Sequence, residues 1–274
     1  MIAADPVFGV FDRMMRAETG QSLDPRRFVH AEAALQPVAR SHGAVDLREL
    51  SRIVASGADH RIAAECVEAL LNQETSFFRD AGVFDLIGQA VLPYLAERRA
   101  ERRRLRIWSA GCAAGQEAYS LAIRAAATPA LAGWTLAILG TDVSPRAIAR
   151  ARDGSYSQFE IQRGLPVRDM LRHFDKEGDR WVVRQPLRSH VRFRLARLPM
   201  RRGMMAQHDL ILCRNLLLYL DPAARGELLD NLADWLAPDG VLILGASETN
   251  FGYCRRLVPS MRFRGCYRLA GAED

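Results

Sequence analysis

A short glycine loop is the first segment whose residue types suggest chemistry. It runs from Ser109 to Gly115, follows the apolar run Leu105–Ala110 and precedes a helical pattern that begins near Glu117. Gly111 and Gly115 would let the backbone approach a ligand closely, and the start of the helix offers unpaired N–H groups. The spacing differs from the GxGxxG of dinucleotide binders and lacks the Lys-Ser/Thr of a P-loop. A tight turn explains the two glycines equally well.

A carboxylate at the end of the next apolar run makes ligand binding more attractive. Asp142 directly follows Leu136–Thr141, which reads as the second strand. At the end of a parallel strand, a carboxylate is placed to accept hydrogen bonds from the ribose hydroxyls of a nucleoside. The alternative is that Asp142 only caps the helix that begins near Ser144. The two segments together predict a nucleoside site, with capping left open.

Two further segments place polar side chains where they could react or bind. Arg214 and Asn215 come just after the apolar run Leu210–Cys213, and Tyr219 follows shortly. Open α/β sheets build their sites at such strand ends. Asn215 could equally be a turn residue and Tyr219 a half-buried aromatic.

The second segment with polar side chains is Gln73–Asp80. In it Thr75 and Ser76 precede two phenylalanines and then Arg79 and Asp80. The phenylalanines suit packing, and Arg79 and Asp80 could be a surface ion pair. The residue pattern alone does not assign this segment a function.

The order of elements predicts a helical N-terminal part followed by an α/β part. Four helices are expected first, at Pro6–Ala17, Phe28–Ser41, after Asp46, and at Ile62–Leu71; a longer one follows at Phe84–Ala100. Strand–loop–helix units then succeed one another, which favours a parallel sheet with helices on both faces. Its further strands are expected at Val191–Leu195, Leu210–Cys213 and Val241–Leu244, with a helix at Pro222–Leu236 and an edge strand or hairpin within Met261–Leu269.

Composition excludes several classes of protein. The five cysteines are scattered without a CxxC pair and form no cluster with the six histidines, so we expect neither disulfides nor a metal site. No secretory signal and no apolar run long enough to span a membrane is visible, which makes the cytoplasm the expected location. Residues 1–96 hold nine Arg against thirteen acids, whereas residues 180–202 hold eight Arg and no acid. Such a run favours an acidic partner or nucleic acid, although a solvated face is commoner.

Five segments resemble, in the right order, the signature segments of CheR-type chemotaxis receptor (protein-glutamate) methyltransferases. They are NQETSFFRD from Asn72, WSAGCAAGQEAYSLAI from Trp108, GTDVSPRAIARARDGSY from Gly140, DLILCRNLLLYLD from Asp209 and GVLILGASETNF from Gly240. The resemblance implies a Rossmann-like domain that binds S-adenosylmethionine (SAM), carries a small β-subdomain and follows an all-helical N-terminal domain. On this basis we expect a helical domain at 1–84, a linker helix at 85–107 and a methyltransferase domain at 108–274, with the β-subdomain at about 165–190.

The same resemblance implies a set of site residues. The residues expected to contact SAM are Gln73, Thr75, Arg79, Gly111, Glu117, Asp142, Arg214 and Asn215. Arg79 and Tyr219 are expected beside the reacting methyl group as the catalytic pair. Gln73 stands where the family usually has Asn, and Ala196 falls near a family Asn, so those two contacts differ from the family pattern.

The implied function is transfer of a methyl group from SAM to glutamate carboxylates on the cytoplasmic helices of chemotaxis receptors, as part of sensory adaptation. Alternatives are a methyltransferase of another acidic protein or of nucleic acid, or a SAM-binding regulatory module. Nucleic acid is disfavoured because only Trp181 and Phe193 interleave with the arginine run. Trp181–Arg184, with residues 176–179 before it, looks like half of a hairpin that turns at Gly178. Some family members capture a receptor's C-terminal pentapeptide by strand addition at this place and have a longer, glycine-richer turn, whereas the turn expected here has Gly178 alone. We therefore expect no pentapeptide tethering and no membrane insertion.

Overall fold

The computed structural model describes residues 5–200 and 206–272 of the chain. The chain divides into two compact units, each with its own hydrophobic core. The first unit contains residues 1–72 and 217–224, and the second contains residues 73–216 and 225–274.

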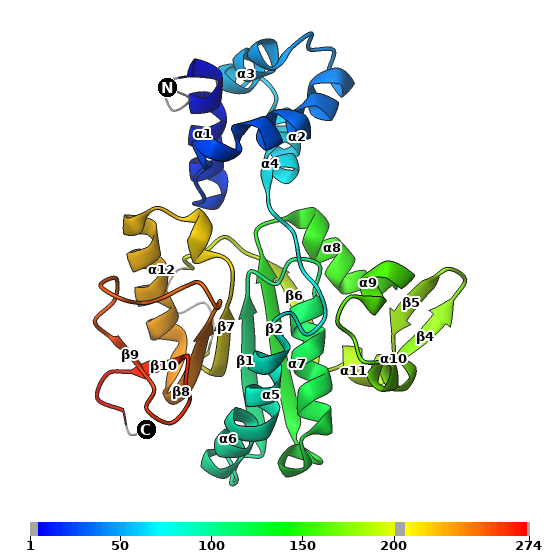
Figure 1. The fold of residues 1–274 in the computed structure, drawn as a ribbon, viewed down its shortest axis with the longest axis vertical. Helices are drawn as coiled ribbons and strands as arrows, with labels where there is room; N and C mark the ends of the chain where they lie inside the picture. The colour runs from blue at the N-terminus through cyan, green and yellow to red at the C-terminus, as the bar shows by residue number, and fades with distance from the viewer. Residues whose placement is uncertain (1–4, 201–205, 273–274) are drawn as a thin grey trace. The chain divides into compact units, whose positions relative to one another are not determined.

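The first unit is helical (Figure 1). Its elements are α1 Pro6–Thr19, the 3₁₀ turn η2 Pro25–Arg27, α2 Phe28–Ser41, α3 Leu47–Ser56, α4 His60–Leu70 and the 3₁₀ turn η5 Leu217–Tyr219. Asp5, Asp46 and Asp59 cap α1, α3 and α4 by accepting a hydrogen bond from a backbone N–H of the first turn. The fully buried residues include Phe11, Leu35, Leu50 and Cys66. The four predicted helices and the Asp46 cap are confirmed.

A late segment of the chain completes this helical unit. The backbone N–H of Ser22 donates to the carbonyl of Tyr219 over 2.7 Å. Arg16 on α1 pairs with Asp221 over 2.6 Å. These contacts tie residues 217–224 to α1 and to the turn that follows it, although residues 73–216, which belong to the second unit, lie between them and the first 72 residues in the sequence.

The second unit is built on a seven-stranded sheet with the order β6-β2-β1-β7-β8-β10-β9. The strands are β1 Arg104–Ala110, β2 Thr135–Asp142, β6 Val191–Leu195, β7 His208–Cys213, β8 Leu236–Leu244, β9 Leu257–Pro259 and β10 Cys266–Leu269. The first five strands of that order pair in parallel, and β10 pairs antiparallel with both β8 and β9. The carboxyl ends of β1, β2 and β7 therefore meet at one edge.

Helices pack on one face of this sheet through its alternating apolar residues. They are α5 Ala81–Leu86, the π-helical turn η3 Ile87–Val91, α6 Leu92–Arg98, α7 Gln116–Ala127 and α8 Pro145–Asp153. The other helical elements that accompany the larger sheet are the 3₁₀ turn η4 Pro129–Leu131 and α12 Pro222–Trp235. Leu105 and Ile107 of β1 and Leu136 and Ile138 of β2 share one core with α7 and α8. Their neighbours Arg104 and Arg106 point to the other face, as the period of two in a strand requires.

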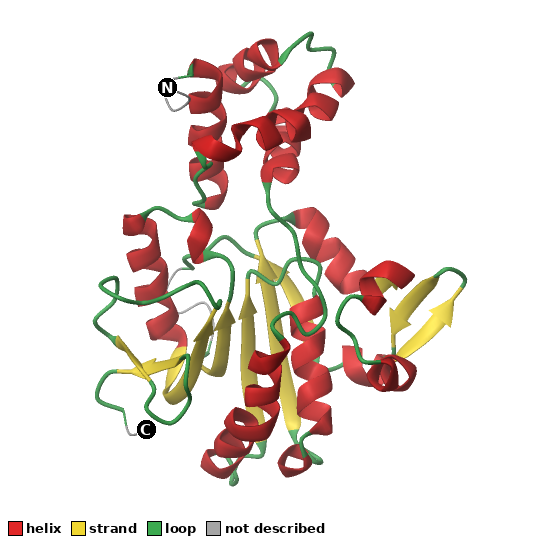
Figure 2. Cartoon of the chain, viewed as in Figure 1, coloured by secondary structure: helices red, strands yellow, loops and turns green. Residues whose placement is uncertain are grey.

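A smaller antiparallel sheet lies within the same unit, with the order β3-β5-β4. Its strands are β3 Ser155–Ser157, β4 Phe174–Glu177 and β5 Arg180–Val183, and the short helices α9 Gln158–Gln162, α10 Val167–His173 and α11 Gln185–Arg188 accompany it. The β4–β5 hairpin projects away from the larger sheet (Figure 2). It turns at Gly178, where φ is +60°, so the predicted turn is confirmed.

Most predicted elements of the α/β part are confirmed, with two differences. The helix expected at Phe84–Ala100 is interrupted by the π-helical turn Ile87–Val91. Met261–Leu269 contains one strand, β10, which pairs with β9 at Leu257–Pro259, before the predicted segment, and β9 rather than β10 occupies the edge of the sheet. The sequence did not predict β9 because a three-residue strand is too short to show alternation.

A buried ion network holds the amino ends of the strands. Arg99, after α6, donates to Asp209 of β7 over 2.8 Å and binds Asp239 through both terminal nitrogens. Arg102 donates to the same Asp209 oxygen over 2.5 Å, and the Arg106 backbone N–H donates to the other oxygen over 2.8 Å. The Asp209 side chain is 2% exposed, so this carboxylate depends on these donors.

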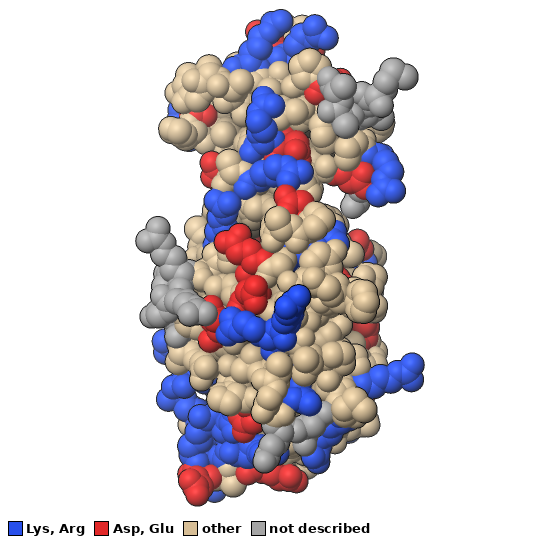
Figure 3. Space-filling model, turned by 90° about the vertical axis from the view of Figure 1, so that its left-hand side faces the viewer, with Lys and Arg blue, Asp and Glu red and all other residues tan. Residues whose placement is uncertain are grey.

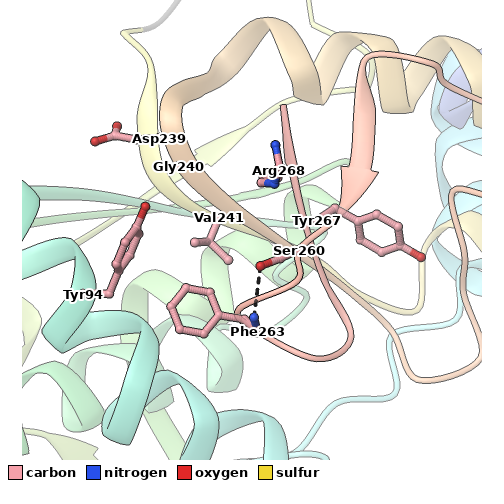
Figure 4. Close-up of a pocket in the computed structure, with 8 residues that line it drawn as sticks. All are labelled: Tyr94, Asp239, Gly240, Val241, Ser260, Phe263, Tyr267 and Arg268. Atoms are coloured by element: carbon pink, nitrogen blue, oxygen red, sulfur yellow. Dashed lines mark hydrogen bonds between the residues drawn. The ribbon is translucent and has the colours of Figure 1, made fainter. Parts of the chain in front are cut away.

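On the face drawn in Figure 3, Lys and Arg side chains gather towards the lower end, with Asp and Glu among them. Figure 4 shows a small cavity lined by Tyr94 of α6, Val241 of β8 and Phe263, whose N–H donates to Ser260. None of the site residues predicted from the sequence lines this cavity. No described helix is long and apolar enough to cross a membrane, and the described residues contain no cluster of potential metal ligands.

Candidate functional site: the carboxyl edge of the sheet

The glycine loop between β1 and α7 is folded tightly against the next strand. The N–H groups of Gly111 and Cys112 both donate to the carbonyl of Thr141, over 2.8 and 2.9 Å. Gly111, Ala113 and Gly115 all have positive φ values, of 79°, 45° and 92°. A Cβ atom on Gly115 would lie 2.9 Å from the Cβ of Ala151. Gly115 is therefore required both by backbone conformation and by close approach to α8.

Asp142 joins two loops at this edge. One carboxylate oxygen accepts from the Ala113 N–H over 2.8 Å, and the other accepts from the Ser144 N–H over 2.9 Å. Ser144 itself is the N-cap of α8, accepting from Ala147, and its hydroxyl also accepts a hydrogen bond from the Gln73 side chain over 3.0 Å. The cap of α8 is thus Ser144, and the half-buried Asp142 fixes the relative position of the loops after β1 and β2.

A buried arginine organises the third strand end. Arg214, after β7, donates to Glu117 of α7 over 3.0 Å and to the backbone carbonyl of Arg79 over 2.8 Å, and it also pairs with Asp80. Its side chain is 2% exposed. Burial raises the pKa of the Glu117 carboxyl, and the positive charge of Arg214 opposes that rise. Ser109 donates to the second Glu117 oxygen over 2.7 Å, so both oxygens of this carboxylate are bonded.

The segment Gln73–Asp80 is anchored to the same edge by its two phenylalanines. The Phe77 ring makes edge contacts with Tyr156 and Phe174, at centroid distances of 5.0 and 5.5 Å. The N–H of Phe78 donates to Ser120 of α7 over 3.0 Å. The packing role predicted for both phenylalanines is confirmed.

Between these anchors the polar side chains of the segment are accessible. Thr75 and Arg79 are half-buried. Arg79 donates from one terminal nitrogen to the Glu74 carbonyl over 3.0 Å. In the part of the chain that the structure describes, its remaining nitrogens bind no residue and could receive an anionic group.

Glu248 is a site residue that the sequence reasoning did not single out. One of its oxygens accepts from the N–H of Asn215 and from that of Gly245, each over 2.7 Å. Asn215 has a φ of 58°, a left-handed conformation that needs such support. A Cβ on Gly245 would lie 2.5 Å from this carboxylate. The only available signal was that Glu248 lies in the last family-like segment, GVLILGASETNF.

Three buried polar atoms at this edge have no partner among the described residues. They are the side-chain oxygen of Gln116, the Nε of Arg214 and the second oxygen of Glu248. An unpaired buried polar group costs about 1–3 kcal/mol. A ligand that carries both hydrogen-bond donors and acceptors would satisfy such atoms, and a nucleoside joined to an amino acid is such a ligand.

Tyr219 lies in the helical unit. Its hydroxyl accepts a hydrogen bond from the side chain of Asn72, the first residue of the NQETSFFRD segment. Its backbone carbonyl also accepts from Ser22. These contacts fix Tyr219 at the end of residues 1–72, where the chain passes into the second unit.

Comparison with known proteins identifies the family of the chain. A family model described as "CheR methyltransferase, SAM binding domain" matches residues 73–258. The chain belongs to the CheR methyltransferase family. It is 31% identical over 254 residues to the chemotaxis protein methyltransferase of Vibrio parahaemolyticus, covering 91% of each chain. It is 31% identical to chemotaxis protein methyltransferase 1 of Pseudomonas aeruginosa, over 90% of this chain and 92% of that one. It is 32% identical to chemotaxis protein methyltransferase Cher2 of Pseudomonas putida, over 88% and 89%.

Family membership confirms the predicted fold class and cofactor. The second unit contains a SAM-dependent methyltransferase domain with a seven-stranded mixed sheet and a small antiparallel sheet, and a helical region precedes it. The residues at the carboxyl edge fit SAM chemically, because they combine a carboxylate, backbone N–H groups of a glycine loop, and buried polar atoms without partners.

Replacing Gly115 by alanine should damage the fold and the site together. The new Cβ would meet Ala151 and Phe193 in a left-handed backbone, which we expect to cost about 1–3 kcal/mol. The matched control is Gly178→Ala, where φ is also positive but nothing lies within 4 Å. Thermal unfolding and SAM titration of both variants test this. Equal stabilities in the two variants would show that the close approach at Gly115 is unimportant.

Proposed function

We propose that this enzyme transfers the methyl group of SAM to glutamate carboxylates on the helical cytoplasmic part of a chemotaxis receptor, forming methyl esters. The chain is a SAM-dependent protein-glutamate methyltransferase. The observation that carries the substrate assignment is the Gln73–Asp80 segment, which bears a partly free Arg79 and is anchored at the same strand ends as Asp142 and Arg214. An arginine so placed suits a carboxylate substrate.

The proposed cofactor contacts follow the edge of the sheet. Asp142 would accept hydrogen bonds from the ribose, since a carboxylate can bond further donors beside its two backbone partners. Gly111 and its loop would approach the cofactor with backbone atoms, and Glu117 and Arg214 would present a fixed charge pair. We assign supporting contacts to the residues that flank them, namely Gln73, Thr75, Arg79 and Asn215.

The chemistry needs orientation more than proton transfer. SAM supplies a methyl group on a positively charged sulfur, and a glutamate substrate is already ionised at neutral pH, so no general base is required. Arg79 and Tyr219 would act as hydrogen-bond donors that hold the attacking carboxylate oxygen in line with the bond between the methyl carbon and the sulfur of SAM. If Arg79 bound the substrate carboxylate too tightly, it would stabilise the ground state and slow the reaction. The contribution of Arg79 therefore lies in aligning the carboxylate. Exclusion of water favours the step because the charges disappear along it.

Substrate docking is assigned to surfaces outside this edge. The exposed arginines of the helical part, including Arg48 and Arg52, would form a local basic patch in an otherwise acidic segment. On the small sheet and the adjoining α11, Arg184 pairs with Asp175 over 2.9 Å, and Arg180 and Arg188 donate to neighbouring hydroxyl or carbonyl oxygens. These bonds leave part of each guanidinium for an acidic receptor surface. We place the reaction in the cytoplasm, with no membrane insertion and no nucleic-acid substrate.

Methyl-labelled SAM and a cytoplasmic receptor fragment test the proposed reaction. We expect label that is released as methanol in mild base, as a glutamate methyl ester requires. Arg79→Ala and Tyr219→Phe should lower turnover while thermal unfolding stays near that of the parent protein. Arg168→Ala, at an exposed position on α10, is the matched control and should keep full activity. Label that resists base, or unchanged turnover in both site variants, would contradict the assignment.

The short turn at Gly178 leads to a separate expectation about tethering. Titrating a receptor-tail pentapeptide against the protein should give no binding at micromolar concentration, because this hairpin lacks the longer, glycine-richer turn of peptide-binding members. Methylation should instead fall as salt rises, since arginines attract the acidic substrate. Micromolar binding of the peptide would show that the turn is no guide to tethering.

A further inference from the structure

Two arginine-rich stretches of the sequence meet on one face of the large sheet. The first precedes and begins β1, and the second runs through β6; β2 lies between these strands. Arg104 and Arg106 from β1 and Arg192 from β6 line a groove there, with His190 beside them. These side chains lie opposite the core that holds α7 and α8, and towards the amino ends of β1 and β2. The groove is therefore distinct from the carboxyl edge where SAM is assigned.

The charges of this groove are not neutralised within the described chain. Arg104, Arg106 and Arg192 form no ion pair and no side-chain hydrogen bond with any residue that the structure describes, and Arg104 and Arg192 are exposed. The nearby carboxylate of Asp209 is already engaged by Arg99, Arg102 and the Arg106 backbone. Three guanidinium groups around one groove form a site for an anion, and guanidinium matches phosphate in a bidentate manner.

The rest of the groove favours a ligand that is more than an anion. Its lining includes Ala137 and Leu139, which are half-buried residues of β2 and offer an apolar surface. His208 also lines it and is 6% exposed. The Nδ1 atom of its ring is buried and has no partner among the described residues.

His208 also indicates what the ligand must supply. Burial lowers the pKa of His208 to about 4, so the ring is neutral at pH 7. In a neutral ring one nitrogen donates and the other accepts, so the unpartnered Nδ1 suits a group that can do either. A sugar hydroxyl both donates and accepts and can therefore pair with Nδ1 in either tautomer.

From these features we infer that the groove binds an organic phosphate of the nucleotide class, independently of SAM. The phosphates lie against Arg104, Arg106 and Arg192, and the ring lies over Ala137 and Leu139. This site does not depend on the proposed methyl acceptor. Free polyphosphate shares the phosphate chemistry and lacks the ring and the sugar hydroxyl, so the two ligands can be told apart.

Calorimetry on the full chain, saturated with S-adenosylhomocysteine to fill the SAM site, tests this inference. GTP is the first probe, because its base differs from the adenine of SAM. We expect GTP to bind, tripolyphosphate to compete more weakly, and guanosine alone to give no signal. The double variant Arg104→Gln/Arg192→Gln should weaken GTP binding roughly tenfold or more, since two charge-assisted contacts are lost. Arg168→Gln/Arg172→Gln, which removes the same charge from α10, should bind as the parent does.

Absence of GTP binding to the chain saturated with S-adenosylhomocysteine would overturn the inference. Equal loss of binding in the control variant would also overturn it, as would tighter binding of an acidic peptide or of single-stranded nucleic acid than of GTP. Methyltransferase activity of the groove variant, measured in parallel, shows whether the variant is folded. A folded groove variant with unchanged GTP affinity would remove the arginines from the site.

Discussion

The buried guanidinium of Arg214 is the interaction on which the site depends. A desolvated charge is costly unless its hydrogen bonds are satisfied, and Arg214 finds Glu117 on α7, the carbonyl of Arg79 and the carboxylate of Asp80. Through these bonds one residue at the end of β7 holds both the helix after β1 and the segment that carries Arg79. Loss of this charge would leave the Glu117 carboxylate buried without its cation. It would also release the C-terminal end of the Gln73–Asp80 segment, where Arg79 and Asp80 bond to Arg214.

Asp142 holds neighbouring segments together at the end of β2, as Arg214 does at the end of β7. Its two oxygens hold the loops before α7 and α8 through backbone N–H groups, and Gln73 reaches the same turn through Ser144. The Gln73–Asp80 segment is therefore fixed at both ends by strand-end residues and in the middle by Phe77 and Phe78. The carboxyl edge of the sheet and the segment that carries Arg79 are positioned by one hydrogen-bond system.

Much of this arrangement could be predicted from the sequence, because strand ends and glycine loops leave local patterns. The positions of Gly111, Asp142, Arg214 and Asn215 after their strands followed from apolar runs and turn residues. Glu248 could not be found in this way, since its role is to accept from the distant Asn215 backbone. The Nδ1 atom of His208 and the meeting of β1 with β6 arginines are likewise products of tertiary packing. For Asp142 the pattern left binding and capping open, and the structure assigns the cap of α8 to Ser144.

The central claim is that Asp142 holds the ribose of SAM as well as the two loops, and calorimetry of SAM binding tests it most directly. Charge-assisted hydrogen bonds contribute about 1.5–3 kcal/mol each, so Asp142→Ala should weaken binding roughly 10- to 100-fold. Asp153→Ala, at the exposed end of α8, should leave the affinity unchanged. Thermal unfolding of both variants shows whether the loops persist. A folded Asp142→Ala protein with the parent's affinity for SAM would contradict the account and reduce Asp142 to a structural link between loops.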